Sequence, residues 1–261
     1  MKLTTIFYYT DEFCKLFERE MKIRVLSSGN NKRNRKCSLI LSEVMTILIY
    51  YHYSGYKTFK DYYEKCPDLR PAFHGMPSYN RFLELQQRVM IPLMIFAKLQ
   101  SAGATTGVSF IDSFPLKVSH VKRASSHKTF KGLARKGKTS VGWFYGFKLH
   151  LIINHRGEVL SFTITPGNVA DNNAQLLEQL TEKMNGKIYG DKGYLTKPSV
   201  FERLYNKGVH LITKIKCNMK NKLIEIQDKI MLRRRGVIES VGAVFKEDFN
   251  IECAAAKLCG R

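Results

Sequence analysis

The spacing of apolar residues along this chain changes near residue 105. Up to that point apolar side chains recur every three or four positions, as on one face of a helix. Beyond it they gather in short runs bounded by turn residues, which is typical of strands. We therefore expect an all-helical region over residues 1–105, followed by a domain that contains a β-sheet.

Helix boundaries in the first region follow from capping and breaking residues. Ser42 is predicted to be the N-cap of a helix that Gly55 stops. A second helix is expected after Pro77-Ser78, and Pro92 is expected to end or kink it. Its buried face is predicted to be Phe82, Leu85 and Val89. Short helices behind the basic turn at residues 31–36 suit a DNA-binding module, or a helical cap on the next domain.

The second region alternates strands and helices over residues 106–245. Gly107–Asp112 and Lys187–Asp191 are predicted to be buried strands that end in an acid, and residues 209–214 are predicted to form a further strand. A hairpin is predicted from 144–153 and 158–165, and helices from 174–184 and 198–206. In order this gives strand, hairpin, helix, strand, helix, strand, helix. That order is typical of an α/β fold with a ribonuclease H-like mixed sheet core flanked by helices.

Charge narrows the class of partner. The 261 residues contain 43 Lys and Arg against 22 Asp and Glu, a formal net charge of +21. This balance favours a polyanion, with nucleic acid first and an anionic membrane second. No apolar run reaches the roughly 18 to 20 residues that span a bilayer, and no apolar signal core follows Met1. We therefore expect a cytoplasmic protein with no membrane partner.

The cysteines indicate thiols rather than a metal centre. None of the six forms a C-x-x-C pair or lies beside a His at ligand spacing. Reduced thiols in a cytoplasmic protein are the expected state, and structural zinc is the minor alternative.

Two acids follow strands directly, Asp112 and Asp191. If the strands are neighbours, about 4.8 Å apart, both carboxylates converge at the carboxyl edge of the sheet. Carboxylates that close repel each other unless cations neutralise them, and hard oxygen ligands select Mg²⁺ or Mn²⁺. A pair of such ions can activate a water or a 3′-hydroxyl for displacement at phosphorus. Either acid alone reads better as a surface group, but their joint occurrence in a very basic chain favours the metal site.

A third acid, Glu239, lies in a predicted helix. Arg235, Glu239 and Lys246 fall at i, i+4 and i+11, so they share one helical face. That face would offer a metal ligand between two cations that grip phosphates. A solvated ion pair at i, i+4 is the ordinary explanation, and spacing alone favours it.

The stretch from Ser113 to Gly157 contains no acid. A flexible basic loop leaving the first acidic strand suits a phosphate backbone. Trp143, Phe144 and Tyr145 could stack on a distorted base, but a place in the core is favoured. The ten cations are Lys117, Lys122, Arg123, Lys128, Lys131, Arg135, Lys136, Lys138, Lys148 and Arg156.

Several motifs combine into a resemblance. Phe110-Ile111-Asp112-Ser113, the D-x-G-Y arrangement at Asp191–Tyr194 and Arg235-x-x-x-Glu239 look like the acidic-triad transposases of insertion sequences. The stretches 146–150, 165–171 and 235–241 add to a similarity with the insertion-sequence 982 family, within the insertion-sequence 4-like superfamily. It covers about residues 39 to 241.

The resemblance implies a DNA transposase with Asp112, Asp191 and Glu239 as catalytic acids that hold two Mg²⁺ ions, with Mn²⁺ as a substitute. Such enzymes cleave one strand at terminal inverted repeats and join the freed 3′-hydroxyl to target DNA. The implied partners are DNA and further copies of the chain, in a bacterial, nucleoid-associated setting with no small-molecule substrate. Repeats would be recognised by the N-terminal helices. Lys148 and His150 would face phosphates, with Asp171 nearby.

The sequence departs from the family after Ser240. Residues 246–261 are expected to form a divergent, truncated tail. Gly236 and Gly242 would each weaken the Glu239 helix by about 1 kcal/mol relative to Ala, leaving it poorly anchored. Leu232 stands where relatives of the superfamily place a tyrosine. Two alternatives therefore stay open: a DNA-binding remnant that cannot cut, and a ribonuclease H-like nuclease.

Overall fold

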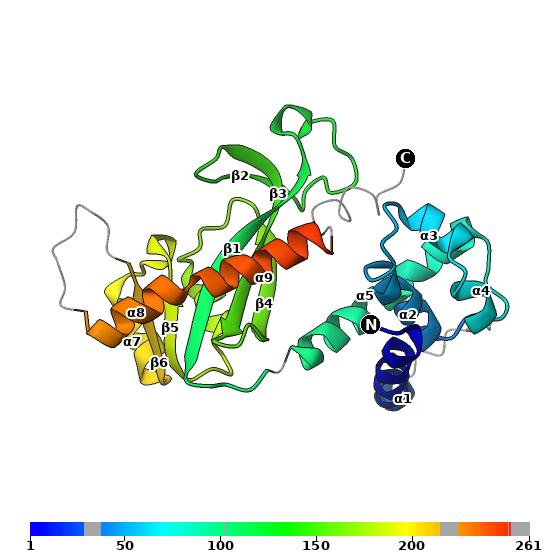
Figure 1. The fold of residues 1–261 in the computed structure, drawn as a ribbon, viewed down its shortest axis with the longest axis horizontal. Helices are drawn as coiled ribbons and strands as arrows, with labels where there is room; N and C mark the ends of the chain where they lie inside the picture. The colour runs from blue at the N-terminus through cyan, green and yellow to red at the C-terminus, as the bar shows by residue number, and fades with distance from the viewer. Residues whose placement is uncertain (29–37, 102, 215–223, 250, 252–261) are drawn as a thin grey trace. The chain divides into compact units, whose positions relative to one another are not determined.

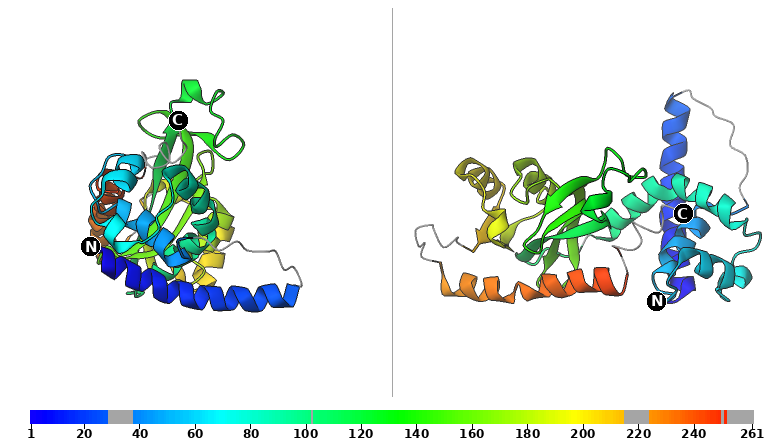
Figure 2. Two further views of the ribbon diagram at one scale, coloured as in Figure 1. Left: turned by 90° about the vertical axis from the view of Figure 1, so that its right-hand side faces the viewer. Right: turned by 90° about the horizontal axis from the view of Figure 1, so that it is seen from above.

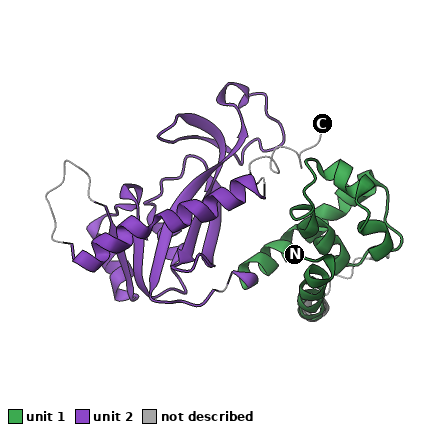
Figure 3. Cartoon of the chain, viewed as in Figure 1, with its two compact units in different colours: residues 1–99 green, residues 100–261 purple. Residues whose placement is uncertain are grey.

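The computed structural model describes residues 1–261 apart from 29–37, 102, 215–223, 250 and 252–261. The chain divides into two compact units, residues 1–99 and 100–261 (Figure 3). The basic turn at residues 31–36 and most of the tail predicted at 246–261 lie outside the described residues.

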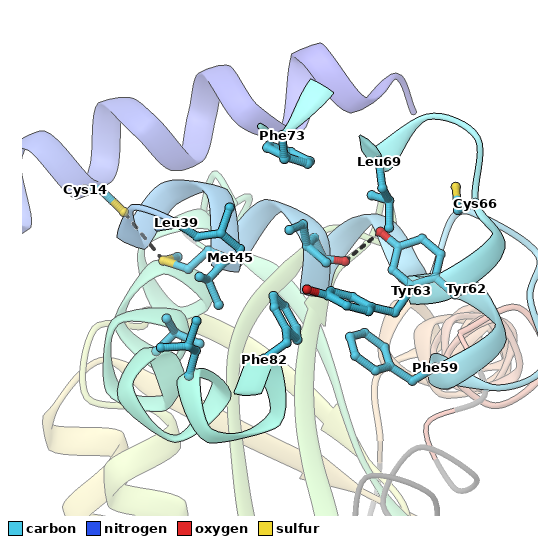
Figure 4. Packing of buried hydrophobic residues seen from close by; sticks show 14 residues of the cluster. Cys14, Leu39, Met45, Phe59, Tyr62, Tyr63, Cys66, Leu69, Phe73 and Phe82 are labelled. Carbon is cyan, nitrogen blue, oxygen red and sulfur yellow. Dashed lines mark hydrogen bonds between the residues drawn. The ribbon is translucent and has the colours of Figure 1, made fainter. Parts of the chain in front are cut away.

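The first unit is helical throughout its regular structure (Figure 1). Its helices are α1 (Leu3–Ser28), α2 (Leu41–Tyr51), α3 (Phe59–Lys65), α4 (Leu69–Ala72) and α5 (Tyr79–Gln100). They enclose one core, in which Phe82, Leu85 and Val89 are buried as predicted. Figure 4 shows the aromatic part of this core, where the Tyr62 hydroxyl donates to the carbonyl of Ile47 at 2.9 Å.

Two helix boundaries predicted for this unit are wrong, and of the two outcomes predicted for Pro92, an end or a kink, the end does not occur. The N-cap of α2 is Ile40, because the Glu43 side chain reaches back to accept from the Ile40 amide at 2.8 Å. Ser42 instead lies buried in the first turn and donates to Asp11. α2 ends at Tyr51, and Gly55 follows with a φ of 74° in the turn beyond. Pro92 does not end α5, which runs on to Gln100; a proline removes one helical hydrogen bond, and burial of the flanking apolar face offsets that loss.

The second unit is built on a mixed sheet. Its path runs β2-β3-β1-β5-β6, and β4 pairs with β3. β1 and β6 each pair in parallel with β5, whereas the other pairs are antiparallel. The strands are β1 (Val108–Ser119), β2 (Arg135–Lys138), β3 (Trp143–Asn154), β4 (Val159–Pro166), β5 (Gly186–Gly190) and β6 (Val209–Thr213). This arrangement is compatible with the ribonuclease H-like fold and confirms the predicted fold class.

Helices cover both faces of the sheet, as the right-hand view of Figure 2 shows. One face packs against α6 (Ala174–Leu180) and α7 (Pro198–Asn206), the other against α8 (Ile226–Arg234) and α9 (Gly236–Glu247). Side chains of a strand alternate between faces. Thus Ile111 packs with α6 and α7, whereas Phe110 packs with α8 and α9. Two short 3-10 turns, η1 (Val121–Arg123) and η2 (Lys192–Tyr194), complete the unit.

Most elements of the second unit were predicted at the right place. α7 has the predicted bounds, and the β3–β4 hairpin turns at Asn154, whose side chain accepts from the amides of Arg156 and Glu158. α6 stops at Leu180 rather than residue 184. Among the described residues, no helix is both long and apolar enough to cross a membrane.

Candidate active site

The two strand acids lie on neighbouring strands of the sheet, β1 and β5, and the charge of Asp191 acts on Asp112. Asp191 directly follows β5, whereas Asp112 lies in the middle of β1 rather than at its end, so that part of the prediction is wrong. β1 is longer because it continues along β3 after its partner β5 has ended. β1 and β5 pair from Val108 opposite Lys187 to Phe110 opposite Tyr189. The same register, carried two residues further, aligns Asp112 with Asp191.

Both acids lie on the face of the sheet that carries α9. Asp112 pairs across the sheet with Leu151, which packs in the α8–α9 core. Tyr189, two residues before Asp191, packs in the same core. Since residues two apart in a strand share a face, Asp112 and Asp191 project to the side where α9 begins.

Arg235 connects the first strand acid to the helix acid. It is the residue before α9, and its guanidinium donates through Nη1 to Asp112 Oδ2 and through Nη2 to Glu239 Oε1, both at 3.2 Å. The Arg235 side chain is 11% exposed, so this is a largely enclosed contact, whereas Glu239 is 62% exposed. The predicted Arg235–Glu239 pair is therefore present, and it also reaches Asp112, which spacing did not show.

Asp112 has the most perturbed acidity in this group. Burial, with a smaller contribution from the charges of Asp191 and Glu239, raises the pKa of Asp112 to about 6. The Arg235 charge and the Ser113 amide, which donates to Asp112 Oδ1 at 2.9 Å, act in the opposite direction. The influence of both other acids on Asp112 shows that the three carboxylates share one electrostatic environment.

The donor chemistry fits a divalent cation. Carboxylate oxygens are the ligands that Mg²⁺ and Mn²⁺ prefer. Within the described ranges no three His, Cys, Asp or Glu side chains are gathered closely enough to hold a metal ion. The Arg235 guanidinium instead lies between Asp112 and Glu239, as a positive charge that stands in for a cation there.

Gly242 sets how closely α9 approaches the sheet. A Cβ atom at this position would fall 2.2 Å from the Phe114 ring, a distance that real contacts do not reach. The Lys246 ammonium lies over the same ring, 5.7 Å from its centre. The prediction that Gly242 leaves this helix poorly anchored is therefore wrong, because the missing side chain is what lets α9 pack against β1.

Lys148 and His150 lie on the opposite face of the sheet from Asp112. His150 is fully buried and shares a 2.9 Å hydrogen bond with Thr165. Burial lowers the pKa of His150 to about 4, so the ring is neutral at physiological pH. The Lys148 ammonium donates to Asp171 and to the carbonyl of Val169, each at 3.0 Å. These contacts hold the segment after β4, and they do not present either residue to a DNA phosphate.

The contacts of Lys148 and His150 join the two stretches 146–150 and 165–171, which lie side by side in the structure. The Gly167 amide donates to the carbonyl of Gly146 at 3.0 Å, beside the His150 and Lys148 contacts. A Cβ at Gly193 would lie 3.3 Å from Asp171, so this cluster touches the D-x-G-Y turn that begins at Asp191. Tyr194 of that turn is buried, and burial raises its pKa well above the usual value. Its packing role was not predicted, although the motif marked the position.

The acid-free stretch, expected to be a flexible basic loop, is in part built of strands. Residues 113–143, here called the basic arm, comprise the outer half of β1, η1, β2 and the start of β3 (Figure 1). Its eight predicted cations are all exposed, and none forms an ion pair with a described residue. They are Lys117, Lys122, Arg123, Lys128, Lys131, Arg135, Lys136 and Lys138.

The second unit thus combines a mixed sheet compatible with the ribonuclease H-like fold and acidic side chains from β1, the end of β5 and α9. Residues 102–257, more than half of the chain, match the family model described as Transposase DDE domain. The chain belongs to this family. No curated protein matches the chain. Membership supports a transposase function with DNA as partner, and DDE transposase domains generally use divalent metal ions.

The acidity of Asp112 predicts an unusual effect on stability. Its folded pKa of about 6 exceeds the usual 3.8, so the folded state binds more protons between these values and stability falls as pH rises through them. Asp112→Asn removes this loss. The metal-free variant should exceed the wild type in free energy of unfolding by about 1–3 kcal/mol at pH 8, and match it near pH 4. Urea unfolding across that range measures the difference.

Asp228→Asn is the control, because Asp228 is another enclosed acid, on the α8 side of the sheet. Burial opposes its ionisation, but hydrogen bonds from Lys187 at 2.9 Å and Tyr189 at 2.7 Å outweigh burial and lower the pKa of Asp228. Its ionised form therefore stabilises the fold above about pH 4, and the substitution should destabilise there. If both substitutions changed the free energy of unfolding at pH 8 in the same direction, the raised pKa of Asp112 would be contradicted.

Proposed function

We propose that this protein is a DNA transposase that cleaves at terminal inverted repeats and joins the freed 3′-hydroxyl to target DNA. Asp112, Asp191 and Glu239 act as its catalytic acids. One observation supports the proposal: Arg235 bonds to both Asp112 and Glu239, while the β1–β5 register, extended two residues beyond its last pair, would bring Asp191 opposite Asp112. Family membership supplies the reaction class.

The three acids would hold two Mg²⁺ ions, with Mn²⁺ as a substitute. When bound, such a pair activates a water or a 3′-hydroxyl and stabilises the leaving oxygen. The protein's own contribution is to fix the first acid, since Ser113 and Arg235 each hold one Asp112 oxygen. Arg235 and Lys246 add positive charge on the α9 side, where a phosphate would lie.

The basic arm would bind the DNA backbone beside these acids. It begins directly after Asp112 and continues along β1, which stays paired with β3 as far as Ser119. Its exposed cations have no competing acid within the arm. Lys148 and His150 are not included in this interface, because one is paired with Asp171 and the other is buried.

The remaining parts of the proposal rest on the resemblance. The helical first unit would recognise the inverted repeats, and several copies of the chain would pair two DNA ends in a bacterial, nucleoid-associated complex. Assignment to the insertion-sequence 982 family belongs to this proposal, as does the boundary between a catalytic domain over residues 106–245 and the tail at 246–261.

One observation favours a second candidate, a DNA-binding remnant that cannot cut. Arg235 already neutralises Asp112 and Glu239, so these acids are satisfied without a metal ion. Incubating the protein with Mg²⁺ and a labelled duplex that carries the repeats flanking its gene separates the candidates. Nicking followed by joining supports the transposase, nicking without joining a nuclease, and binding without nicking the remnant.

The basic arm predicts a salt effect that can be measured by itself. Replacing Lys128 and Lys131 by alanine should lower the slope of log affinity for duplex DNA against log salt by about two, because each phosphate contact releases about one counterion. Fluorescence anisotropy of a labelled duplex over a series of KCl concentrations gives the slope.

Lys183 and Lys207 provide the control substitution. Both are exposed lysines in the loops that precede β5 and β6, at the opposite edge of the sheet from Asp191. Their replacement by alanine should leave the slope unchanged. If the salt slope fell equally in both double variants, the arm would not be a specific DNA contact.

A further inference from the structure

The tip of the β2–β3 hairpin presents an exposed tryptophan. Trp143 is 63% exposed and Val141 is 92% exposed, whereas Phe144 and Tyr145, the next residues of β3, are buried. The expectation that all three aromatic residues lie in the core is therefore right for two and wrong for Trp143. Tryptophan is enriched at binding interfaces, where one side of the ring is apolar and the other meets solvent.

The hairpin holds this ring in a defined place. Trp143 pairs with Lys138 at the end of β2, and the turn between them is closed by hydrogen bonds in both directions between Thr139 and Gly142, at 2.9 and 3.2 Å. Gly142 has a φ of 149°, and the Thr139 hydroxyl donates to its carbonyl. A site presented on paired strands is ordered before it binds, which lowers the entropy lost on binding.

The cations around the Trp143 ring favour an anionic partner, and the ring itself favours a partner with planar aromatic groups. The Lys138 ammonium lies 5.8 Å from the centre of the Trp143 ring, a cation–π distance. The arm from Ser113 onward has no acid, and its cations are exposed. Nucleic acid offers both complements, since phosphates attract the cations and every base has a face on which an indole stacks.

We propose that the hairpin tip, residues 138–143, binds DNA by stacking Trp143 on an unpaired base while Lys138 contacts the neighbouring phosphate. The inference rests on the proposed function, which supplies DNA as the partner, and adds a base contact that lies outside the acidic edge. Stacking tolerates any base, so this contact would recognise unpaired DNA and not a particular sequence.

Trp143 is the only tryptophan in the chain, so its emission reports on this site alone. The full-length protein is titrated with a single-stranded thymidine oligonucleotide, with a blunt duplex and with vesicles of anionic phospholipid. Emission should be quenched by the single strand at saturation and changed less by the duplex. A response to vesicles alone would overturn the inference in favour of a membrane contact.

Variants test whether stacking contributes to affinity. Trp143→Ala should weaken binding of the labelled single strand by about 5- to 100-fold, and Trp143→Phe should restore most of the loss. Leu133→Ala is the control, because Leu133 is an equally exposed apolar residue of the arm, at 64%. The stacking contact alone would be overturned if the single strand left the wild-type emission unchanged and Trp143→Ala bound the strand as tightly as the wild type. Failure of the wild type to bind any DNA would overturn the proposed function as well.

Discussion

Asparagine in place of Asp112 or Asp191 is expected to reduce Mg²⁺-dependent DNA cleavage by at least about 1,000-fold, because divalent ions stabilise the transition state by several kcal/mol. Binding of DNA should stay the same or become tighter, since each variant removes a negative charge beside the phosphates. Initial rates on a supercoiled plasmid and affinities for a labelled duplex measure the two effects separately.

Asp228→Asn is the control for this pair as well. Asp228 is enclosed on the same side of the sheet, but its contacts are with Lys187 and Tyr189, not with the acidic edge. It should cleave at the wild-type rate per folded molecule, although it is less stable. Cleavage by Asp112→Asn at the rate of Asp228→Asn would remove Asp112 from the catalytic group.

Gly242→Ala is expected to lower the free energy of unfolding by about 1–3 kcal/mol, the usual effect of overpacking a tight contact. In a helix with open space around it, the same change would stabilise by about 1 kcal/mol. The sign reverses here because the new methyl group would collide with the Phe114 ring under α9. Since α9 carries Glu239, cleavage should fall together with stability. Urea unfolding at constant pH measures the first effect.

Gly236→Ala is the matched substitution in the same helix. No atom lies within 4 Å of a Cβ built at Gly236, so only the helix preference acts and stability should rise by about 0.5 kcal/mol. Stabilisation by both alanines would contradict the close packing of α9 on β1.

The elements that the sequence predicted well are those whose signals are local. α7 begins with Pro198 at its first turn, and the β3–β4 turn has Asn154 and Gly157 where a tight turn needs them. A short apolar run likewise identified β5 with Asp191 directly after it. Such features depend on residues only a few positions apart, and a single sequence contains all of them.

The features that were missed depend on residues far apart in the chain. Asp112 lies in mid-strand because β3 extends the ladder beyond β5, and His150 is hidden because its side of the sheet is covered. Trp143 is exposed because β2, a short edge strand, leaves it uncovered. The sequence around Gly242 likewise predicts a weakened helix, because it does not show that the Phe114 ring packs against this glycine.

The most direct test of the acidic group is metal binding. Electron paramagnetic resonance of free Mn²⁺, measured with the duplex-bound protein, counts the ions bound without requiring cleavage. The account predicts two Mn²⁺ ions for the wild type and for Asp228→Asn, and clear loss of binding in Asp112→Asn, Asp191→Asn and Glu239→Gln. Equal Mn²⁺ binding by all five proteins, or none by the wild type, would contradict the claim that these three acids form one metal site.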